Sequence, residues 1–284
     1  MNPAPPRKPG WLKVRIPHTD GFARVNRVVS SHGLHTVCRE ARCPNISECF
    51  DSGTATFLVL GDVCTRNCLY CNVRHGTPAE IDGSEPERVA EAVAELGLDY
   101  VVITSVTRDD LPDGGADIFA GCIRSIRRTS PDCRVEALVP DFGGNGEALD
   151  RVLDAGPCLL NHNMEVVKPL FPALRPQGNY DASLEVLRHA SAAGVWSKSG
   201  LMIGFGERRE DIIALAADLR ETGCRSLTIG QYLQPSRGHL PVRKYYTPSE
   251  FLELEQIARD MGFSRIESGP LVRSSYRAAR SGCT

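Results

Sequence analysis

Short apolar runs alternate with amphipathic stretches along most of the chain. The runs are rich in valine, isoleucine, leucine and threonine, a composition typical of strands buried on both faces of a sheet. The stretches between them repeat their apolar positions with a helical period, so that Val89, Val93 and Leu96 fall on one stripe. We predict strands at 54–60, 100–105, 134–139, 158–161, 197–203 and 226–230. We predict helices at 85–96, 116–128, 146–155, 181–193, 211–222 and 248–261, the last with Thr247 as its N-cap.

Six strands that alternate with helices predict a parallel sheet with right-handed crossovers. Such a sheet is either open and doubly wound or curled into a barrel. We favour an α/β fold, a partial (βα)6 TIM-type barrel, because polar residues follow the predicted strands, and barrel active sites assemble at that rim. These residues are Asn161, Asn163, Glu165, Gly204, Gly206, Glu207, Gln231 and Gln234. We expect an N-terminal extension at 1–53, the barrel at 54–261 and a C-terminal extension at 262–284.

Composition limits the partners and the cellular location that we expect for the protein. The chain has 284 residues and a net charge of −2, so no basic field predicts binding to nucleic acid. No stretch approaches the roughly 18 consecutive apolar residues of a membrane span. The first residues contain no apolar core of signal-peptide length. We therefore expect a cytoplasmic protein with neither a membrane nor a nucleic acid as partner.

Two cysteine triplets lie close together in the first quarter of the chain. One is spaced C-x4-C-x5-C and the other C-x3-C-x2-C. The six residues are Cys38, Cys43, Cys49, Cys64, Cys68 and Cys71. Thiolates at such intervals in short loops can converge on one metal centre, as they do around iron–sulfur clusters. Three ligands per cluster leave one iron of a four-iron cluster open to a small molecule.

Two other uses of these cysteines have to be weighed. Disulfides need an oxidising compartment, which the expected cytoplasmic location does not provide. A structural zinc site closes a tetrahedron with four ligands, often from two C-x2-C or C-x2-H pairs. Neither triplet has that pairing, although His35 and His75 are near enough in sequence to be spare ligands. The other cysteines are interpreted as small buried hydrophobic side chains: Cys122, Cys133, Cys158, Cys224 and Cys283.

The segment 64–71, with Tyr70 directly before its third cysteine, resembles the signature of the radical S-adenosylmethionine (SAM) superfamily. The resemblance implies that Cys64, Cys68 and Cys71 hold a [4Fe-4S] cluster whose open iron binds SAM. Together they would generate a 5′-deoxyadenosyl radical, which abstracts hydrogen from unactivated C–H bonds. No side-chain acid or base performs that chemistry.

Two further motifs tighten the resemblance to one family. The segment 38–49 is similar to the auxiliary-cluster motif of lipoyl synthases, and 273–276, Arg-Ser-Ser-Tyr, is similar to that family's third hallmark. Residues from about 11 to 278 fit the family throughout. The resemblance implies a second [4Fe-4S] cluster, with Ser275 as its oxygen ligand beside the thiolates of the first triplet. Since iron in such clusters is normally held by thiolate, a single oxygen ligand would be a weak point where iron can be lost.

The resemblance also implies an activity and partners. A lipoyl synthase is a sulfurtransferase that inserts two sulfur atoms at C6 and C8 of an octanoyl chain on a protein lysine. It consumes two SAM molecules, and the auxiliary cluster donates the sulfur. The implied partners are octanoylated lipoyl domains of 2-oxoacid dehydrogenase E2 subunits and the glycine cleavage H protein, an electron donor such as ferredoxin or flavodoxin, and an iron–sulfur carrier. The alternatives are another radical sulfur-inserting enzyme, similar to biotin synthase or the methylthiotransferases, and a zinc-stabilised interaction module.

A further set of residues is predicted to bind SAM. The segment 200–207 resembles the superfamily motif G-x-I-x-G-x-x-E, with Met202 at the isoleucine position. Lys198 is a candidate for the methionine carboxylate. The pair at 104–105 departs from the glycine-rich turn that binds the amine in other members. The full set is Tyr70, Thr104, Ser105, Asn161, Asn163, Glu165, Lys198, Gly204, Glu207 and Gln231.

Overall fold

The computed structural model describes residues 7–13, 20–51 and 55–278. Its centre is one sheet of eight strands in the order β1-β2-β5-β6-β7-β8-β9-β10. β1 pairs antiparallel with β2, and every other neighbouring pair is parallel. The strands are β1 (His35–Thr36), β2 (Thr56–Val59), β5 (Tyr100–Ser105), β6 (Arg134–Leu138), β7 (Leu159–Asn161), β8 (Ser197–Ile203), β9 (Ser226–Gln231) and β10 (Arg265–Gly269).

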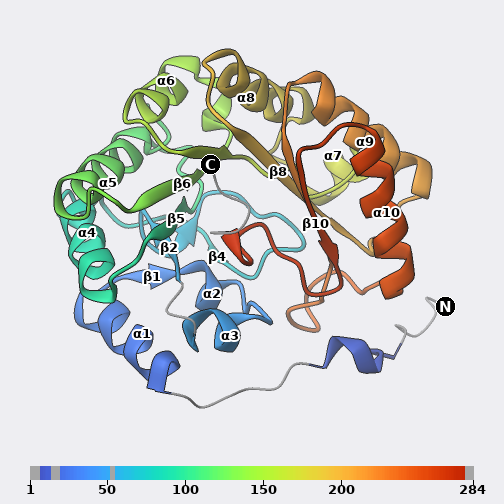
Figure 1. Cartoon of the computed structure of the whole chain (residues 1–284), viewed down its shortest axis with the longest axis horizontal. Helices are drawn as coiled ribbons and strands as arrows, with labels where there is room; N and C mark the ends of the chain where they lie inside the picture. The colour runs from blue at the N-terminus through green and yellow to red at the C-terminus, as the bar shows by residue number, and fades with distance from the viewer. Residues whose placement is uncertain (1–6, 14–19, 52–54, 279–284) are drawn as a thin grey trace.

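Six helices lie around the outside of the curled sheet (Figure 1). They are α4 (Glu85–Leu96), α5 (Ala116–Thr129), α6 (Gly146–Asp154), α8 (Tyr180–Ala192), α9 (Arg209–Glu221) and α10 (Pro248–Asp260). Within the described residues β1 and β10 are the two ends of the sheet, so the barrel is open. The partial barrel predicted from the alternation of strands and helices is confirmed.

Local signals explain where these helices begin and end. α10 follows Thr247, whose hydroxyl accepts from the Glu250 amide while the Glu250 carboxylate accepts from the Thr247 amide. α4 ends at Gly97, which adopts the left-handed conformation with φ of 64°. Cys122, Cys133 and Cys224 are buried free thiols, as expected. Cys158 differs, because it is half-buried and disulfide-bonded, and Cys283 lies outside the described residues.

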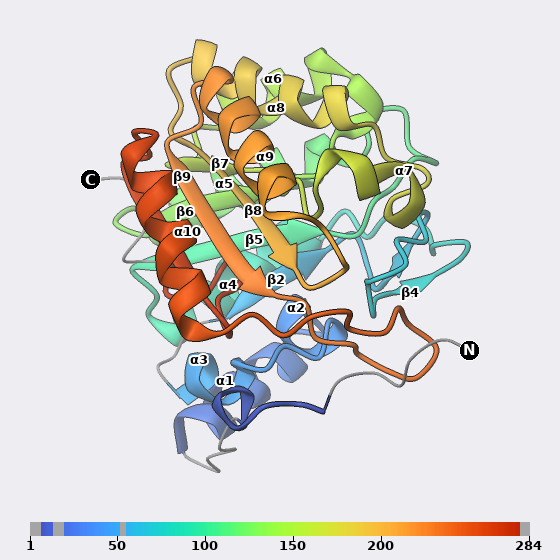
Figure 2. The same cartoon turned by 90° about the vertical axis from the view of Figure 1, so that its right-hand side faces the viewer.

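The sequence analysis missed β10 and the N-terminal helices. β10 is a seventh parallel strand, but all five of its residues are half-buried and it has no apolar run. The N-terminal helices are α1 (Asp20–Ser31), α2 (Val37–Glu40) and α3 (Ile46–Asp51). They lie at the carboxyl ends of the strands (Figure 2). In the part of the chain that the structure describes, no helix is both long enough and apolar enough to cross a membrane.

Candidate active site

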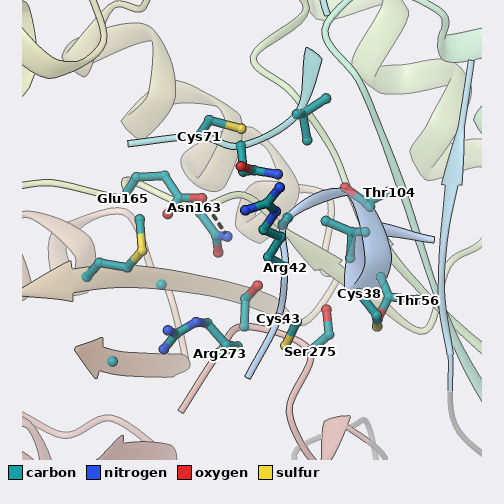
Figure 3. A pocket seen from close by; sticks show the side chains of 18 of the residues that line it. Cys38, Arg42, Cys43, Thr56, Cys71, Thr104, Asn163, Glu165, Arg273 and Ser275 are labelled. Atoms are coloured by element: carbon teal, nitrogen blue, oxygen red, sulfur yellow. Dashed lines mark hydrogen bonds between the residues drawn. The ribbon is translucent and has the colours of Figure 1, made fainter. Parts of the chain in front are cut away.

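A cavity of about 760 Å³ lies at the carboxyl ends of the strands. Both cysteine triplets line it, although they come from separate segments (Figure 3). The C-terminal segment reaches it as well, with Arg273, Ser274, Ser275 and Tyr276. All the residues predicted to ligate clusters therefore face one space: Cys38, Cys43, Cys49, Cys64, Cys68, Cys71 and Ser275.

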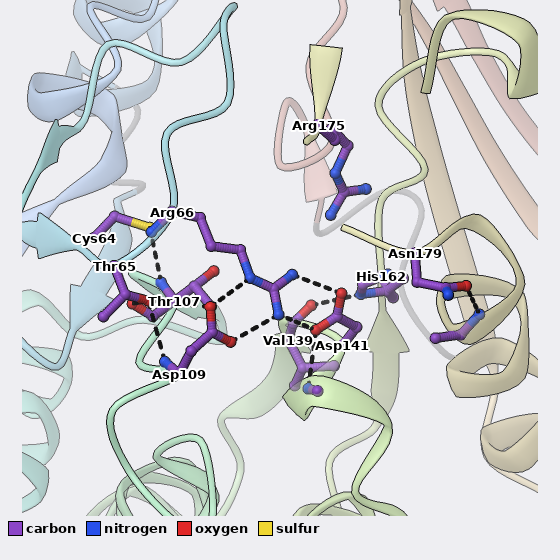
Figure 4. Close-up of polar contacts among 12 residues, drawn as sticks. Cys64, Thr65, Arg66, Thr107, Asp109, Val139, Asp141, His162, Arg175 and Asn179 are labelled. Carbon is purple, nitrogen blue, oxygen red and sulfur yellow. Dashed lines mark hydrogen bonds and ion pairs between the residues drawn. The ribbon is translucent and has the colours of Figure 1, made fainter. Parts of the chain in front are cut away.

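The loop that carries the second triplet is fixed by a buried arginine. It begins on β3 (Val63–Cys64) and precedes β4 (Arg74–His75). Arg66 makes bidentate contacts of 2.7–2.8 Å with both Asp109 and Asp141 (Figure 4). Burial would raise the pKa of Asp141, but the Arg66 guanidinium outweighs it and lowers that pKa to about 2. These contacts tie the loop to the segments that follow β5 and β6.

The thiols of this loop are surrounded by backbone amides and by buried side chains. Cys64 Sγ accepts hydrogen bonds from the amides of Arg66 and Thr107 at 3.4 and 3.3 Å. Burial raises the pKa of Cys71 to about 12, so a metal must displace its proton. No three cysteine, histidine or carboxylate side chains among the described residues converge as a single-ion site.

The first triplet lies on α2, α3 and the turn between them. Burial raises the pKa of Cys38 to about 11, and burial followed by its cysteine neighbours raises that of Cys49 to about 12. The C-terminal segment is tied to this region at two points. Asn45 Nδ2 donates to the Leu271 carbonyl at 2.7 Å, and the Tyr276 hydroxyl donates to Glu48 at 2.9 Å.

Gly230 of β9 allows the C-terminal segment to cross the end of the barrel. A Cβ at this position would lie 2.1 Å from the Val272 carbonyl oxygen. Only a residue without a side chain lets the two backbones approach this closely. The crossing brings Ser275 into the cavity that Cys43 also faces (Figure 3).

Five of the predicted SAM-binding residues line the cavity: Tyr70, Thr104, Ser105, Asn163 and Glu165. Ser105 Oγ and Asn163 Oδ1 are buried and have no hydrogen-bond partner among the described residues. Glu165 adopts a φ of 66° and accepts from Asn163 Nδ2 at 3.0 Å. A Cβ at Gly200 would lie 2.9 Å from Asn163 Oδ1, so the glycine keeps this space open. Unpaired polar atoms around such a space fit a polar ligand such as SAM.

The other five predicted SAM-binding residues do not line the cavity. The side chains of Lys198 and Glu136 are fully buried inside the barrel and pair at 3.0 Å. Asn161 and the Tyr100 hydroxyl also donate to Glu136, at 2.8 and 2.6 Å. The structure therefore places Lys198 in an interior network rather than at a ligand.

Gly204, Glu207 and Gln231 brace the strand ends. The Glu207 carboxylate accepts from the amides of Gly204 and Phe205 at 2.7 and 2.9 Å. Gln231 Nε2 donates to the Ile203 and Lys244 carbonyls, both at 3.0 Å. These side chains bind backbone groups at the ends of β8 and β9 and so hold the two strand ends in place.

Sequence reasoning missed two cavity residues, Arg175 and His162. Arg175 follows α7 (Phe171–Leu174), and its Nη1 donates to the Asn163 and Met164 carbonyls, both at 3.1 Å. It is 8 % exposed, and no carboxylate of the described residues forms an ion pair with it. Nothing in the local sequence singled it out, because an arginine before a proline is usually an exposed loop residue.

His162 is the second residue that was missed, although its asparagine neighbours were noted. Its Nδ1 donates to the Val139 carbonyl at 2.8 Å, and Nε2 is buried without a partner among the described residues. Burial, followed by the charge of Arg175, lowers the pKa of His162 to about 4. The ring is therefore neutral near pH 7 and presents a free acceptor.

Comparison with known proteins agrees with this arrangement. Residues 58–219 match the radical SAM superfamily, and residues 2–43 match the N-terminal domain of lipoyl synthase. The chain is 55% identical to a lipoyl synthase of Rubrobacter xylanophilus, over 95% of this chain and 85% of that protein. It is 48% identical to a lipoyl synthase of Bacteroides thetaiotaomicron, over 96% of this chain and 97% of that protein.

Solved structures share the fold at low sequence identity. Methylornithine synthase superposes with a TM-score of 0.56 and 13% identity, over 86% of this chain and 77% of that chain. A maturase of the [FeFe]-hydrogenase gives a TM-score of 0.53 and 16% identity, over 80% of this chain and 61% of that chain. The superfamily match implies a [4Fe-4S] cluster and SAM as cofactors. With three motifs in one cavity and close relatives along nearly its whole length, the chain belongs to the lipoyl synthase family of radical SAM enzymes, which insert sulfur.

Proposed function

We propose that this chain inserts two sulfur atoms, at C6 and C8, into an octanoyl chain carried on a lysine of a lipoyl carrier protein. The observation that carries the proposal is the shared cavity. Cysteines of both triplets and Ser275 face the same space, which is what two centres acting on one carbon chain require. Effective chemistry between two groups depends on holding them close and aligned.

The predicted ligands form two groups, one for each cluster. Cys64, Cys68 and Cys71 would hold the SAM-binding [4Fe-4S] cluster. The auxiliary [4Fe-4S] cluster would be held by the first triplet together with a serine: Cys38, Cys43, Cys49 and Ser275. When bound, the SAM-binding cluster with SAM supplies a carbon-based radical, and the auxiliary cluster supplies sulfur.

The other cavity residues have roles that follow from their charge and pairing. Arg175 is a buried cation that forms no salt bridge with a carboxylate of the described chain, although the Glu165 carboxylate acts on it at longer range, and an anion in the cavity would further offset its desolvation. It replaces Lys198 as the candidate for the methionine carboxylate of SAM. Asn163 and Glu165 are candidates for the ribose hydroxyls or the methionine amine, and His162 offers an acceptor to a ligand N–H or O–H group.

The partners follow from the substrate. Octanoylated lipoyl domains of 2-oxoacid dehydrogenase E2 subunits and the glycine cleavage H protein would present the acyl chain at the cavity. A low-potential donor such as ferredoxin or flavodoxin would supply electrons, and an iron–sulfur carrier would rebuild the auxiliary cluster. We place this chemistry in the cytoplasm, where such donors occur and where most thiols stay reduced, although Cys158 is disulfide-bonded.

The test is an anaerobic assay with protein reconstituted to ~8 iron atoms per chain, the content of two four-iron clusters. An octanoylated carrier peptide, SAM and a reductant are added, and mass spectrometry follows the peptide. We expect two sulfur atoms to be added, through a product that carries one. Loaded protein that cleaves SAM but leaves the peptide without sulfur would refute the proposal, as would a protein that binds stoichiometric zinc instead of iron.

A further inference from the structure

Three hydrogen bonds connect the two cysteine loops and the turn that follows β9. Asn72 Nδ2 donates to the Glu40 carbonyl at 2.7 Å. His239 Nε2 contacts the Cys71 carbonyl at 3.0 Å. Arg42 Nη1 donates to the Pro235 carbonyl at 3.4 Å. The three bonds close a ring of three segments, which we call the three-loop contact: Glu40, Arg42, Cys71, Asn72, Pro235 and His239.

The three-loop contact links the loops of the two triplets through the Asn72 side chain, which donates to the main chain of the other loop. Asn72 follows the last cysteine of the second triplet, and Glu40 and Arg42 lie between the first two cysteines of the other. Every donor is a side chain and every acceptor is a backbone carbonyl, so each bond ties a side chain of one segment to the main chain of another. Arg42 and Cys71 both face the cavity (Figure 3). The two triplets are therefore connected by local hydrogen bonds as well as through the barrel.

The turn after β9 is itself firmly closed. The Gln234 side chain donates to the His239 carbonyl at 2.7 Å, and the His239 amide donates to the Ser236 carbonyl at 3.1 Å. His239 Nδ1 lies 2.8 Å from Ser236 Oγ. Since Nε2 faces a carbonyl, Nε2 carries the ring proton and Nδ1 accepts from the Ser236 hydroxyl. Both ring nitrogens are thus engaged, which fixes the orientation of the His239 ring.

We propose that Asn72 and His239 are positioning residues that set the spacing between the two cysteine triplets, an inference that rests on the proposed function. Hydrogen removal and sulfur delivery must reach the same carbon atom, and the two events depend on different triplets. A misplacement of about 1 Å can cost a reaction about 100-fold. Without the three-loop contact each triplet keeps its own ligands, but the distance between them is no longer held.

The test compares reconstituted Asn72→Ala and His239→Ala proteins with the wild type. Both variants should keep the iron content and the SAM cleavage of the wild type. The ratio of 5′-deoxyadenosine formed to sulfur inserted should rise about 10-fold, because misplaced groups react inefficiently. Hydrogen exchange, read by mass spectrometry, should increase in peptides 38–49 and 64–72 but not in 100–105.

Two further variants serve as controls. His239→Gln retains a side-chain N–H for the Cys71 carbonyl and should restore most of the wild-type ratio. His189→Ala makes the same histidine substitution at α8, where the ring contacts Asp150 at 2.7 Å, and should change neither readout. The inference is overturned if both alanine variants keep the wild-type ratio and exchange, or if they lose iron. A wild-type protein that adds no sulfur would instead refute the proposed function, and the exchange data would still test the three-loop contact.

Discussion

The two cysteine loops are held in different ways. The loop at 64–71 is fixed by buried charge, because Arg66 pairs with two carboxylates and both Arg66 and Asp141 are under one-tenth exposed. The loop at 38–49 is held by packing against α1, by hydrogen bonds to Asn72 and to the C-terminal segment, and by an exposed ion pair between Glu48 and Arg277. One loop is built into the barrel, and the other is attached to its rim.

The difference matches what the proposed function asks of each loop. Breaking a buried ion pair leaves an uncompensated charge and is strongly unfavourable. Exposed ion pairs contribute little and open easily. Under the proposed function, the loop with the buried ion pairs would carry the cluster that stays intact, and the loop with the exposed ion pair would carry the cluster that is consumed and rebuilt.

The largest effect is expected from Cys68→Ala. Loss of one of the three thiolates should abolish SAM cleavage, because the two that remain would not hold the SAM-binding cluster. The auxiliary cluster should remain, so iron should fall to ~4 atoms per chain. Iron analysis with a 5′-deoxyadenosine assay checks this. Loss of all the iron would show that the two loops do not load independently.

Ser275→Ala should separate the two activities. SAM cleavage should persist, since the serine does not belong to the second triplet, while sulfur transfer to the octanoyl peptide should be suppressed. Mass spectrometry of the peptide measures the outcome. Normal lipoyl product from this variant would remove Ser275 from the auxiliary site.

Arg66→Ala tests the buried charge directly. Leaving Asp141 buried without its partner should lower the free energy of unfolding by about 3–5 kcal/mol, measured with urea. The wild type should also lose about 2 kcal/mol at acid pH. This stability is present above the unfolded pKa of 3.8 and is lost as the pH falls towards the folded value of about 2. The variant should lack that acid dependence. The control is Arg74→Ala, whose pair with Asp62 is exposed and screened by solvent, so its loss should leave the free energy of unfolding almost unchanged.

Gly230→Ala tests the path of the C-terminal segment. The new Cβ would meet the Val272 carbonyl, so either the segment or β9 must shift, at a cost of about 1–3 kcal/mol. Sulfur transfer should fall more than SAM cleavage, since Ser275 follows the displaced residue. The control is Gly83→Ala, whose new Cβ would lie in open space, and it should leave both sulfur transfer and SAM cleavage unchanged. Equal loss of both activities would contradict this path.

The smallest effect is expected from Glu48→Gln. It removes the charge partner of Arg277, and exposed ion pairs contribute under about 1 kcal/mol. Hydrogen exchange in 271–278 should rise while unfolding in urea hardly changes. An effect as large as that of Arg66→Ala would erase the difference between the two loops.

The sequence by itself determined the alternating elements and the cluster motifs. Both follow from signals carried within a few residues, because burial on two faces produces apolar runs and cluster ligands come from short loops. The predicted limits of the strand at 100–105 and the helix at 85–96 agree with β5 and α4. The limits of the three expected parts stay a prediction, since the boundary at 53–54 lies outside the described residues.

Only the tertiary structure decided which polar residues face the ligand space. Lys198 looked available, but Glu136 lies 62 positions away and pairs with it inside the barrel. Arg175 looked like a loop residue, but the fold buries it beside the second triplet. His239 and Cys71 are 168 positions apart. Such pairings depend on how the strands curl and where loops cross, and no local period or spacing encodes contacts between residues so far apart in the chain.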